Sequence, residues 1–169
     1  PIQTNAVDFT KQPCFGDNDG EISVNLIGGM PSMTGESYNL EWTAVSDNSP
    51  VGNTSILTAA AAGDYILSVV DANNCTFDTT ITLNNIPKIE VAFDLANVTG
   101  VDCFDTVDPA DCNGFASATA AYEGTGGGVF TFTWGATGET VTATDAFNSS
   151  SLCAGMQLLS VSDGQCEIV

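Results

Sequence analysis

Hydrophobic and polar residues alternate in short segments along most of this chain, with the two-residue period of a β-strand. The segments are rich in Val, Ile, Thr, Phe and Tyr, which favour strands. No stretch shows the apolar repeat of about 3.6 residues that marks an amphipathic helix, and the alanine run 59–62 is too short to form a helix by itself. The pattern therefore predicts an all-β protein.

The predicted strands follow one another at intervals of roughly ten residues, with Gly, Asn and Asp between them. They cover residues 21–27, 38–43, 54–58, 63–70, 76–83, 89–95, 115–122, 129–134, 140–144 and 156–162. Short strands at this spacing indicate a sandwich or barrel, and we expect an immunoglobulin-like β-sandwich.

The two halves of the chain repeat one another. In each half a tryptophan, a glycine and an aspartate are separated by 21 and then 8 residues. These residues are Trp42, Gly63 and Asp71, and then Trp134, Gly155 and Asp163. A glycine patch precedes each tryptophan segment, at 28–29 and at 126–128. The repetition predicts two tandem immunoglobulin-like modules, 1–86 and 87–169, joined at a segment that contains Pro87.

The cysteines predict that each module is stapled by disulfides. Six cysteines at wide spacings, with no histidine, indicate disulfide bonds formed in an oxidising compartment. The first half contains only Cys14 and Cys75, so these must bond if each module closes on itself. With the repeat as a guide, the predicted bonds are Cys14–Cys75, Cys103–Cys166 and Cys112–Cys153.

Three aromatic residues are candidates for the core between the sheets. Trp42, Tyr65 and Trp134 all lie inside predicted alternating strands. The alternative for the two tryptophans is exposure on the surface, where they would stack on sugars. We expect all three side chains to be buried.

The charge of the chain excludes several classes of partner. Lys11 and Lys88 stand against 21 acidic residues, which gives a formal net charge of -19. Such a surface repels nucleic acids and anionic lipid head groups, and no apolar run is long enough to span a membrane. The sequence starts at Pro1 without a leader, so we expect a processed protein or an excerpt from a longer one.

Catalysis is not expected. The common Ser and Cys triads need a histidine, and the chain has none. With 21 acidic residues, close carboxylate pairs of the glycosidase kind arise by chance, and no flanking pattern singles one out.

Calcium is the one cofactor that the sequence makes a candidate. Both halves gather carboxylates in a loop near their first cysteine, and oxygen-rich loops suit Ca²⁺. The candidate ligands are Asp17, Asp19 and Glu21, and then Asp102, Asp105, Asp108 and Asp111. The EF-hand pattern is not met, and the alternative is a solvated acidic loop that keeps the surface soluble.

Several blocks of residues resemble a known family. The second half carries Leu152-Cys153-Ala154-Gly155 and Val161-Ser162-Asp163-Gly164-Gln165-Cys166, and the first half carries Val70-Asp71-Ala72-Asn73-Asn74-Cys75. Together with Cys112-Asn113-Gly114, these blocks resemble the SprB-type repeat of giant surface adhesins of gliding Bacteroidetes. The chain departs from that family at 30–35 and at Gln157.

The resemblance implies a protein of the bacterial cell surface, exported by the type IX secretion route and used in adhesion or gliding motility. Its expected partners are neighbouring repeats of the same or an adjacent chain, and a surface polysaccharide or protein ligand. Asp-Thr motifs at Thr79 and Thr106 resemble the O-glycosylation acceptor of Bacteroidetes, and N-glycosylation sequons begin at Asn53, Asn97 and Asn148. Such short motifs are common in a Thr-rich chain, and we expect most of them to be unmodified.

The two halves differ after their last cysteine. A full predicted strand follows Cys75, whereas three residues follow Cys166, so we expect the second module to lack an edge strand unless a continuing or neighbouring chain supplies it. The sequence as a whole predicts a non-catalytic structural and adhesive segment. The alternatives are a carbohydrate- or protein-binding module with calcium-bound loops, and a subunit that polymerises by strand donation.

Overall fold

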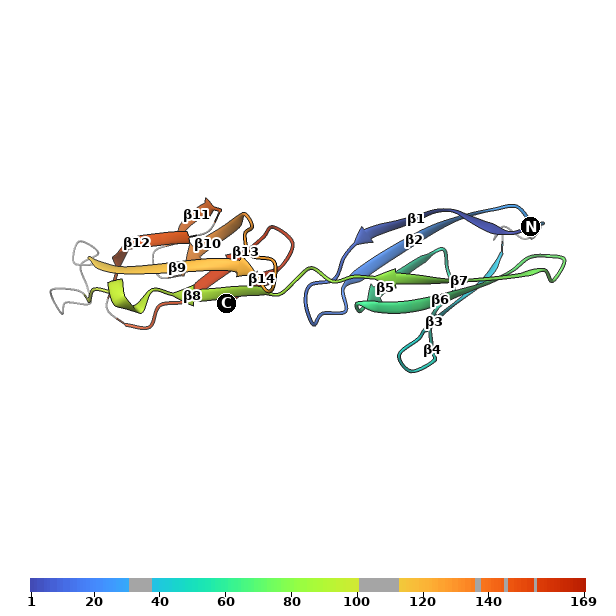
Figure 1. Ribbon diagram of the computed structural model, residues 1–169, viewed down its shortest axis with the longest axis horizontal. Coiled ribbons are helices and arrows are strands. Elements are labelled where there is room, and N and C mark those ends of the chain that lie inside the picture. Colours follow the sequence, from blue (N-terminus) through green and yellow to red (C-terminus); the bar gives the residue numbers. More distant parts are fainter. Residues whose placement is uncertain (31–37, 101–112, 136–137, 145, 154) are drawn as a thin grey trace. The chain divides into compact units, whose positions relative to one another are not determined.

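The computed structural model describes residues 1–30, 38–100, 113–135, 138–144, 146–153 and 155–169. These residues form an all-β protein whose single helical element is the short 3-10 helix η1 (Leu95–Asn97). They divide into two compact units, Pro1–Ile86 and Pro87–Val169, which have the bounds of the two modules expected from the sequence (Figure 1). No helix in the described part of the chain could cross a membrane.

The described residues of the first unit form seven strands in two antiparallel sheets. They are β1 (Gln3–Lys11), β2 (Gly20–Ile27), β3 (Asn39–Ala44), β4 (Ser49–Gly52), β5 (Ile56–Ala60), β6 (Gly63–Val70) and β7 (Thr76–Leu83). One sheet has the order β1-β2-β5 and the other has the order β4-β3-β6-β7.

The core of the first unit lies between these two sheets. Alternate residues of β2 on one side, and of β3, β6 and β7 on the other, form one buried apolar cluster together with Leu57 and Ala60 of β5. Trp42 and Leu67 are completely buried there, and Tyr65 is 5% exposed and donates a hydrogen bond to the carbonyl of Ala61. Burial of both inner faces makes the unit a two-layered β-sandwich.

The part of the second unit that the structure describes also forms seven strands in two antiparallel sheets. They are β8 (Ile89–Phe93), β9 (Gly114–Tyr122), β10 (Phe130–Trp134), β11 (Glu139–Ala143), β12 (Ala146–Leu152), β13 (Leu159–Ser162) and β14 (Glu167–Ile168). The orders are β12-β9-β8 and β11-β10-β13-β14. In both units, therefore, the first, second and fifth strands form one sheet, and the fourth, third, sixth and seventh form the other.

The register of the central strands is also the same in both units. Trp42 is paired with Leu67 between β3 and β6, and Trp134 with Leu159 between β10 and β13. Both tryptophans are buried in the core, as expected from their strands, so the alternative of exposed, sugar-stacking tryptophans is wrong. Trp42 and Trp134 therefore occupy corresponding positions in the pairing of the third strand with the sixth.

Four strands were not predicted from the sequence. Strands β4 and β14 are very short, and β1 and β12 are rich in polar residues, so their apolar alternation is weak. Two predicted segments occupy different positions in the strand order of their units. Segment 54–58 overlaps β5, the fifth strand, whereas segment 140–144 overlaps β11, the fourth strand.

The glycine patch after β2 allows the chain to pass close to a buried aspartate. Gly29 has a φ of +61°, which L residues rarely adopt. A Cβ atom on Gly29 would lie 2.7 Å from Cγ1 of Ile2 and 2.9 Å from Oδ2 of Asp71. The patch is thus required for close approach to the turn that contains Asp71.

We expect Gly29→Ala to destabilise the first unit by at least about 1 kcal/mol more than Gly16→Ala, because the added methyl group meets Ile2 and Asp71. Gly16 is a matched control, since its φ is +85° and a Cβ atom added to it would have no neighbour within 4 Å. Urea unfolding followed by Trp42 fluorescence, in a Trp134→Phe background, measures both changes. Equal destabilisation by the two substitutions would contradict the steric argument.

Candidate functional site

A buried aspartate organises the hairpin turn between β6 and β7. Asp71 is 5% exposed. Its Oδ1 accepts hydrogen bonds from the backbone N–H groups of Asn73 and Cys75, both at 2.9 Å, and its Oδ2 accepts one from the N–H of Met30 at 3.0 Å. The N–H of Ala72 in turn donates to the carbonyl of Met30 at 3.0 Å. One carboxylate thus joins the turn to the segment that follows β2.

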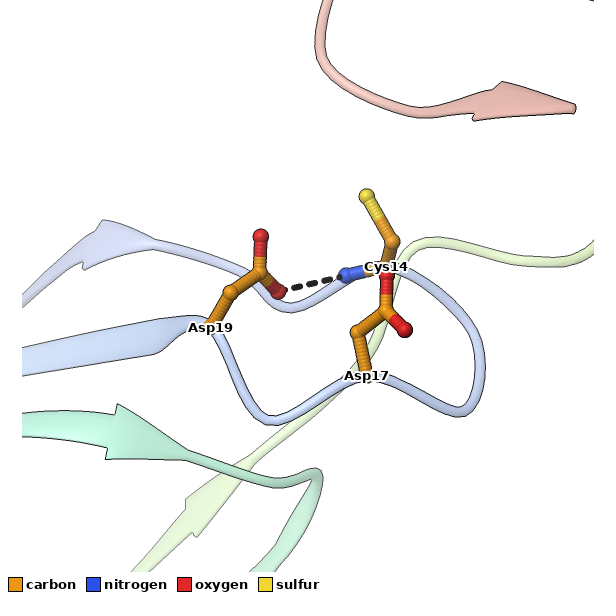
Figure 2. Close-up of side chains that lie close together, drawn as sticks. All are labelled: Cys14, Asp17 and Asp19. Carbon is orange, nitrogen blue, oxygen red and sulfur yellow. Dashed lines mark hydrogen bonds between the residues drawn. The ribbon is translucent and has the colours of Figure 1, made fainter.

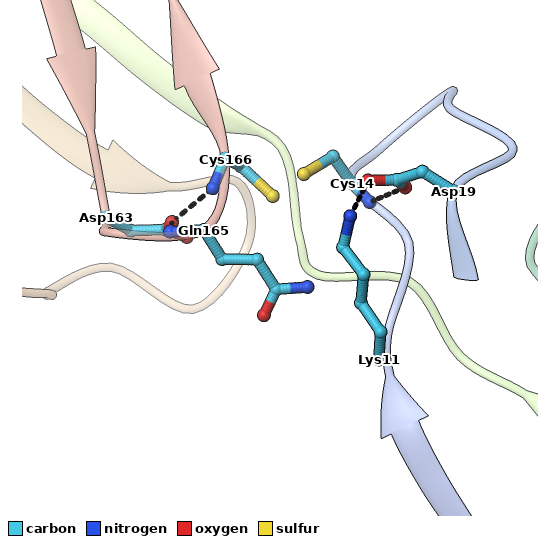
Figure 3. A network of polar contacts seen from close by, with 6 residues as sticks. All are labelled: Lys11, Cys14, Asp19, Asp163, Gln165 and Cys166. Atoms are coloured by element: carbon cyan, nitrogen blue, oxygen red, sulfur yellow. Dashed lines mark hydrogen bonds and ion pairs between the residues drawn. The ribbon is translucent and has the colours of Figure 1, made fainter. Parts of the chain in front are cut away.

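The corresponding turn of the second unit is built on Asp163. Its Oδ1 accepts hydrogen bonds from the N–H groups of Gln165 at 2.9 Å and Cys166 at 2.7 Å. Figure 3 shows the carboxylate facing these two amides. Its Oδ2 accepts a bond from the hydroxyl of Tyr122, at the end of β9, at 2.9 Å. In both units the aspartate ties the last hairpin to the end of the second strand.

The hydrogen bonds stabilise the ionised form of both carboxylates. The amides of Met30 and Cys75 hold the pKa of Asp71 below its ordinary value. Burial by itself raises the pKa of Asp163, but the amides of Cys166 and Gln165 and the hydroxyl of Tyr122 outweigh it, so this pKa is lowered as well. The sequence marked both aspartates as repeat positions but did not assign them this role. The signal was an aspartate at the start of a short polar segment after a strand, because such a side chain commonly accepts a hydrogen bond from the backbone two residues further on.

The acidic loop between β1 and β2 contains the calcium candidates of the first unit. Cys14, Asp17 and Asp19 bring one sulfur and two carboxylates within 4.8 Å of one another (Figure 2). The sulfur of Cys14 belongs to a disulfide and is not a thiolate ligand. Glu21 is not a member of this group and lies in β2, paired in register with Lys11. The structure therefore brings two of the three predicted carboxylates together.

A lysine neutralises part of this loop. The ammonium group of Lys11 donates to Oδ2 of Asp19, and the backbone N–H of Cys14 donates to Oδ1 at 3.2 Å (Figure 3). The contact with Lys11 is the main reason that the pKa of Asp19 lies below its ordinary value. Asp102, Asp105, Asp108 and Asp111 lie outside the described residues, and calcium binding stays a prediction for both loops.

The disulfide predicted between Cys14 and Cys75 is wrong. Cys14 is disulfide-bonded, whereas Cys75 has a free, exposed thiol. Cys75 directly precedes β7, and Cys14 lies at the other end of that strand, where the N–H of Ile86 donates to the carbonyl of Pro13 at 2.8 Å. Eight extended residues span about 25 Å, far beyond the Cα separation of roughly 7 Å that a disulfide tolerates. The two cysteines of the first unit are therefore not bonded to each other.

The other two predicted bonds include residues outside the described part of the chain. Cys153 and Cys166 are disulfide-bonded, and Cys103 and Cys112 are not described. The pairing of Cys103 with Cys166 was inferred by analogy with Cys14–Cys75 and loses its basis with it. The pairing of Cys112 with Cys153 stays a prediction.

The candidate glycosylation residues lie in different surroundings. Asn53 and Asn148 are exposed, and Asn97 is the last residue of η1. Thr79 is half-buried on the side of β7 that also carries the buried Ile81, so the structure leaves it less accessible than the two asparagines. Thr106 lies outside the described residues. Modification of any of these residues stays a prediction.

Comparison with known proteins gives no relative from which a function could be transferred. No protein-family model matches the chain. No curated protein matches it significantly. Any function must therefore be argued from its own residues.

We expect Cys75 to react with iodoacetamide in the native protein, because its thiol is free and exposed. Peptide mapping should find the label on Cys75, while Cys14, Cys153 and Cys166 stay unlabelled until a reductant is added. Cys75→Ser is the control, and it should abolish native labelling without loss of the folded state. Recovery of Cys75 in a peptide cross-linked to Cys14 would contradict the structure.

We expect the second unit to lose stability as the pH falls below about 4, because a carboxyl group with a lowered pKa stabilises the fold only while it is ionised. The stabilisation of the fold by ionised Asp163 is complete above the ordinary pKa of an aspartate. It is lost as the pH falls through the lowered pKa of Asp163. Asp163→Asn should reduce the loss, and at pH 7 it should lower the free energy of unfolding by about 1–2 kcal/mol.

Urea unfolding between pH 2 and pH 7, followed by Trp134 fluorescence in a Trp42→Phe background, measures this dependence. Glu123→Gln makes the same change of charge at an exposed position of the same unit. If Glu123→Gln alters the acid dependence as much as Asp163→Asn does, the turn aspartate is not its source.

Proposed function

We propose that this chain is a non-catalytic structural and adhesive segment of a large secreted bacterial surface protein, made of two tandem immunoglobulin-like modules of the SprB type. One observation carries the proposal. Both units have the same strand order and the same pairing of tryptophan with leucine, and both anchor the last hairpin on an aspartate at the same place. Serial repetition of one β-sandwich is typical of proteins that extend from a cell surface.

The strand order supports the immunoglobulin-like assignment. Seven antiparallel strands in a sheet of three and a sheet of four, with a tryptophan of the third strand buried between the sheets, are typical of that class of sandwich. The agreement of register between the two units supports descent from one duplicated module. Convergence would have to reproduce both the topology and the positions of the buried residues.

The chemistry of the chain supports an extracellular location without catalysis. Cys14, Cys153 and Cys166 are disulfide-bonded, and structural disulfides persist in oxidising compartments. Asp71 and Asp163 use their carboxylates to hold the backbone amides of a turn, which is a structural role. The strongly acidic surface suits a protein that stays soluble in a crowded exterior.

The leading proposal is tested in the organism that makes the protein. Antibodies raised against the chain should label intact, unpermeabilised cells. Protease treatment of such cells should remove both the label and a polypeptide much larger than the 17.4 kDa of the two units. An antibody against a cytoplasmic protein is the control for intact cells. Labelling only after lysis, or a polypeptide of about the size of the two units, would contradict the proposal.

A further inference from the structure

Strand β7 is an edge strand of the four-stranded sheet in the first unit. All eight of its residues pair with β6, in a register without a bulge. Every second side chain points away from the core and is exposed. These edge residues of β7 are Thr76, Asp78, Thr80 and Thr82. The strand therefore offers a long and regular edge.

The backbone groups of the edge residues point away from β6. The N–H of Asp71 donates to the carbonyl of Cys75 at 3.0 Å, and on the opposite side of β6 the carbonyl of Asp64 accepts from the N–H of Val45 at 2.9 Å. Backbone groups alternate in direction along a strand, so β6 bonds to β7 through its odd-numbered residues. Their partners in β7 are odd-numbered as well. The N–H and C=O groups of the even-numbered edge residues are therefore directed toward the open edge.

The other edges of this sandwich carry features that hinder pairing with a further strand. Strand β1 has two register shifts and ends at Lys11, and β4 has four residues that include Pro50. In β5, Ala59 has a φ of +54°, and the register with β2 shifts there. Bulges, lysines, prolines and short length are common ways in which a protein blocks an edge. Among the described edge strands of the first unit, β7 alone has none of these features.

We propose that two copies of this chain associate by antiparallel pairing of their β7 edges, with a two-fold axis at Thr79. In this register Thr76 lies opposite Thr82 of the second copy, so the two ends of the strand are both paired. Asp78 lies opposite Thr80 of the second copy. The only charged residue of β7 therefore meets a hydroxyl group and not a second carboxylate.

The core-facing side chains of β7 match in the same register. Phe77 lies opposite Ile81, and Thr79 lies opposite its own copy; aromatic–β-branched and Thr–Thr pairs stabilise antiparallel strands. A shift by one residue would place exposed side chains opposite core-facing ones. An axis at Asp78 would bring two carboxylates together, and an axis at Thr80 would pair fewer edge residues. This self-complementarity favours a second copy over an unrelated segment as the partner.

Pairing about a two-fold axis produces a dimer and not a fibre. The contact uses the same edge of both copies, so it leaves no β7 edge open for a third copy. It adds about eight interchain hydrogen bonds, because each edge residue contributes one N–H and one C=O group. The four-stranded sheets of the two copies become one continuous sheet. Two neighbouring chains are thereby held side by side.

The first test is the mass of the intact chain in solution. Sedimentation equilibrium over a wide range of concentration should show the mass rising from 17.4 kDa to twice that value. The net charge of -19 on each copy opposes association. The measurement is therefore made in about 0.15 M salt, where exposed charges more than about 8 Å apart are screened.

Charge variants at Thr80 test the register. Thr80→Asp places like charges opposite each other at Asp78 of the second copy and should weaken association at least about tenfold. Thr80→Lys places opposite charges there and should strengthen association. Thr58→Asp and Thr58→Lys make the same changes at an exposed position of β5 and should alter association less than about twofold. Fluorescence of Trp42 checks that each variant is folded.

A cross-link tests the position of the axis. The two copies of residue 79 would form a non-hydrogen-bonded pair with Cα atoms about 4.5 Å apart, a separation that a disulfide tolerates. Cys75→Ser combined with Thr79→Cys should therefore form a disulfide-linked dimer on mild oxidation. Cys75→Ser combined with Thr58→Cys should form one far more slowly, and Cys75→Ser removes the free native thiol from both. Peptide mapping identifies the link, and this result decides if a Thr80 variant does not fold.

Four results would overturn the proposal. The first is a mass that stays at 17.4 kDa at every concentration. The second is a dimer that Thr80→Asp does not weaken, which would place the interface elsewhere. The third is a dimer that Thr80→Lys weakens as much as Thr80→Asp does, and the fourth is equal cross-linking through positions 79 and 58. None of these results would bear on the proposed surface role, which does not depend on association.

Discussion

Contact between two apolar sheet faces is the interaction on which each unit depends. In each unit the third strand places a tryptophan against a leucine of the sixth strand, and residues of the opposite sheet cover them. Because side chains in a strand alternate between faces, one shift in register would turn this whole set toward solvent. The hairpin aspartates hold the last hairpin of each unit to the end of its second strand, which helps to maintain that register.

The sequence predicted the elements that carry strong alternation. Strands β6 and β7 have the predicted bounds because Ile81 and Leu83 alternate with threonines in β7, and because Tyr, Ile and Val, which favour strands, are concentrated in β6. Strands β4 and β14 were missed because two to four residues are too few to show a period. The burial of Trp42 and Trp134 was likewise predictable, since it follows from the same alternation.

The disulfides could not be predicted in this way. A cysteine count says nothing about which end of a sandwich a residue lies at, and the error for Cys14 and Cys75 arose from this. The two cysteines are separated by the length of β7. The hairpin aspartates were predictable only in part. Their repetition in both halves was visible in the sequence, but the amides that they bind were not.

The arrangement of β1 and β7 has a mechanical consequence for the first unit. Strand β1 begins beside the Asp71 turn, where the carbonyl of Pro1 approaches Gly28, and β7 ends beside Pro13, where the N–H of Ile86 is bonded. The chain thus enters the unit at one end and leaves it at the opposite end. Tension along the polypeptide would pull β1 lengthwise against β2, so that the force acts in shear on many interstrand hydrogen bonds together. A sandwich loaded in this geometry resists extension better than one whose strands are peeled apart one pair at a time.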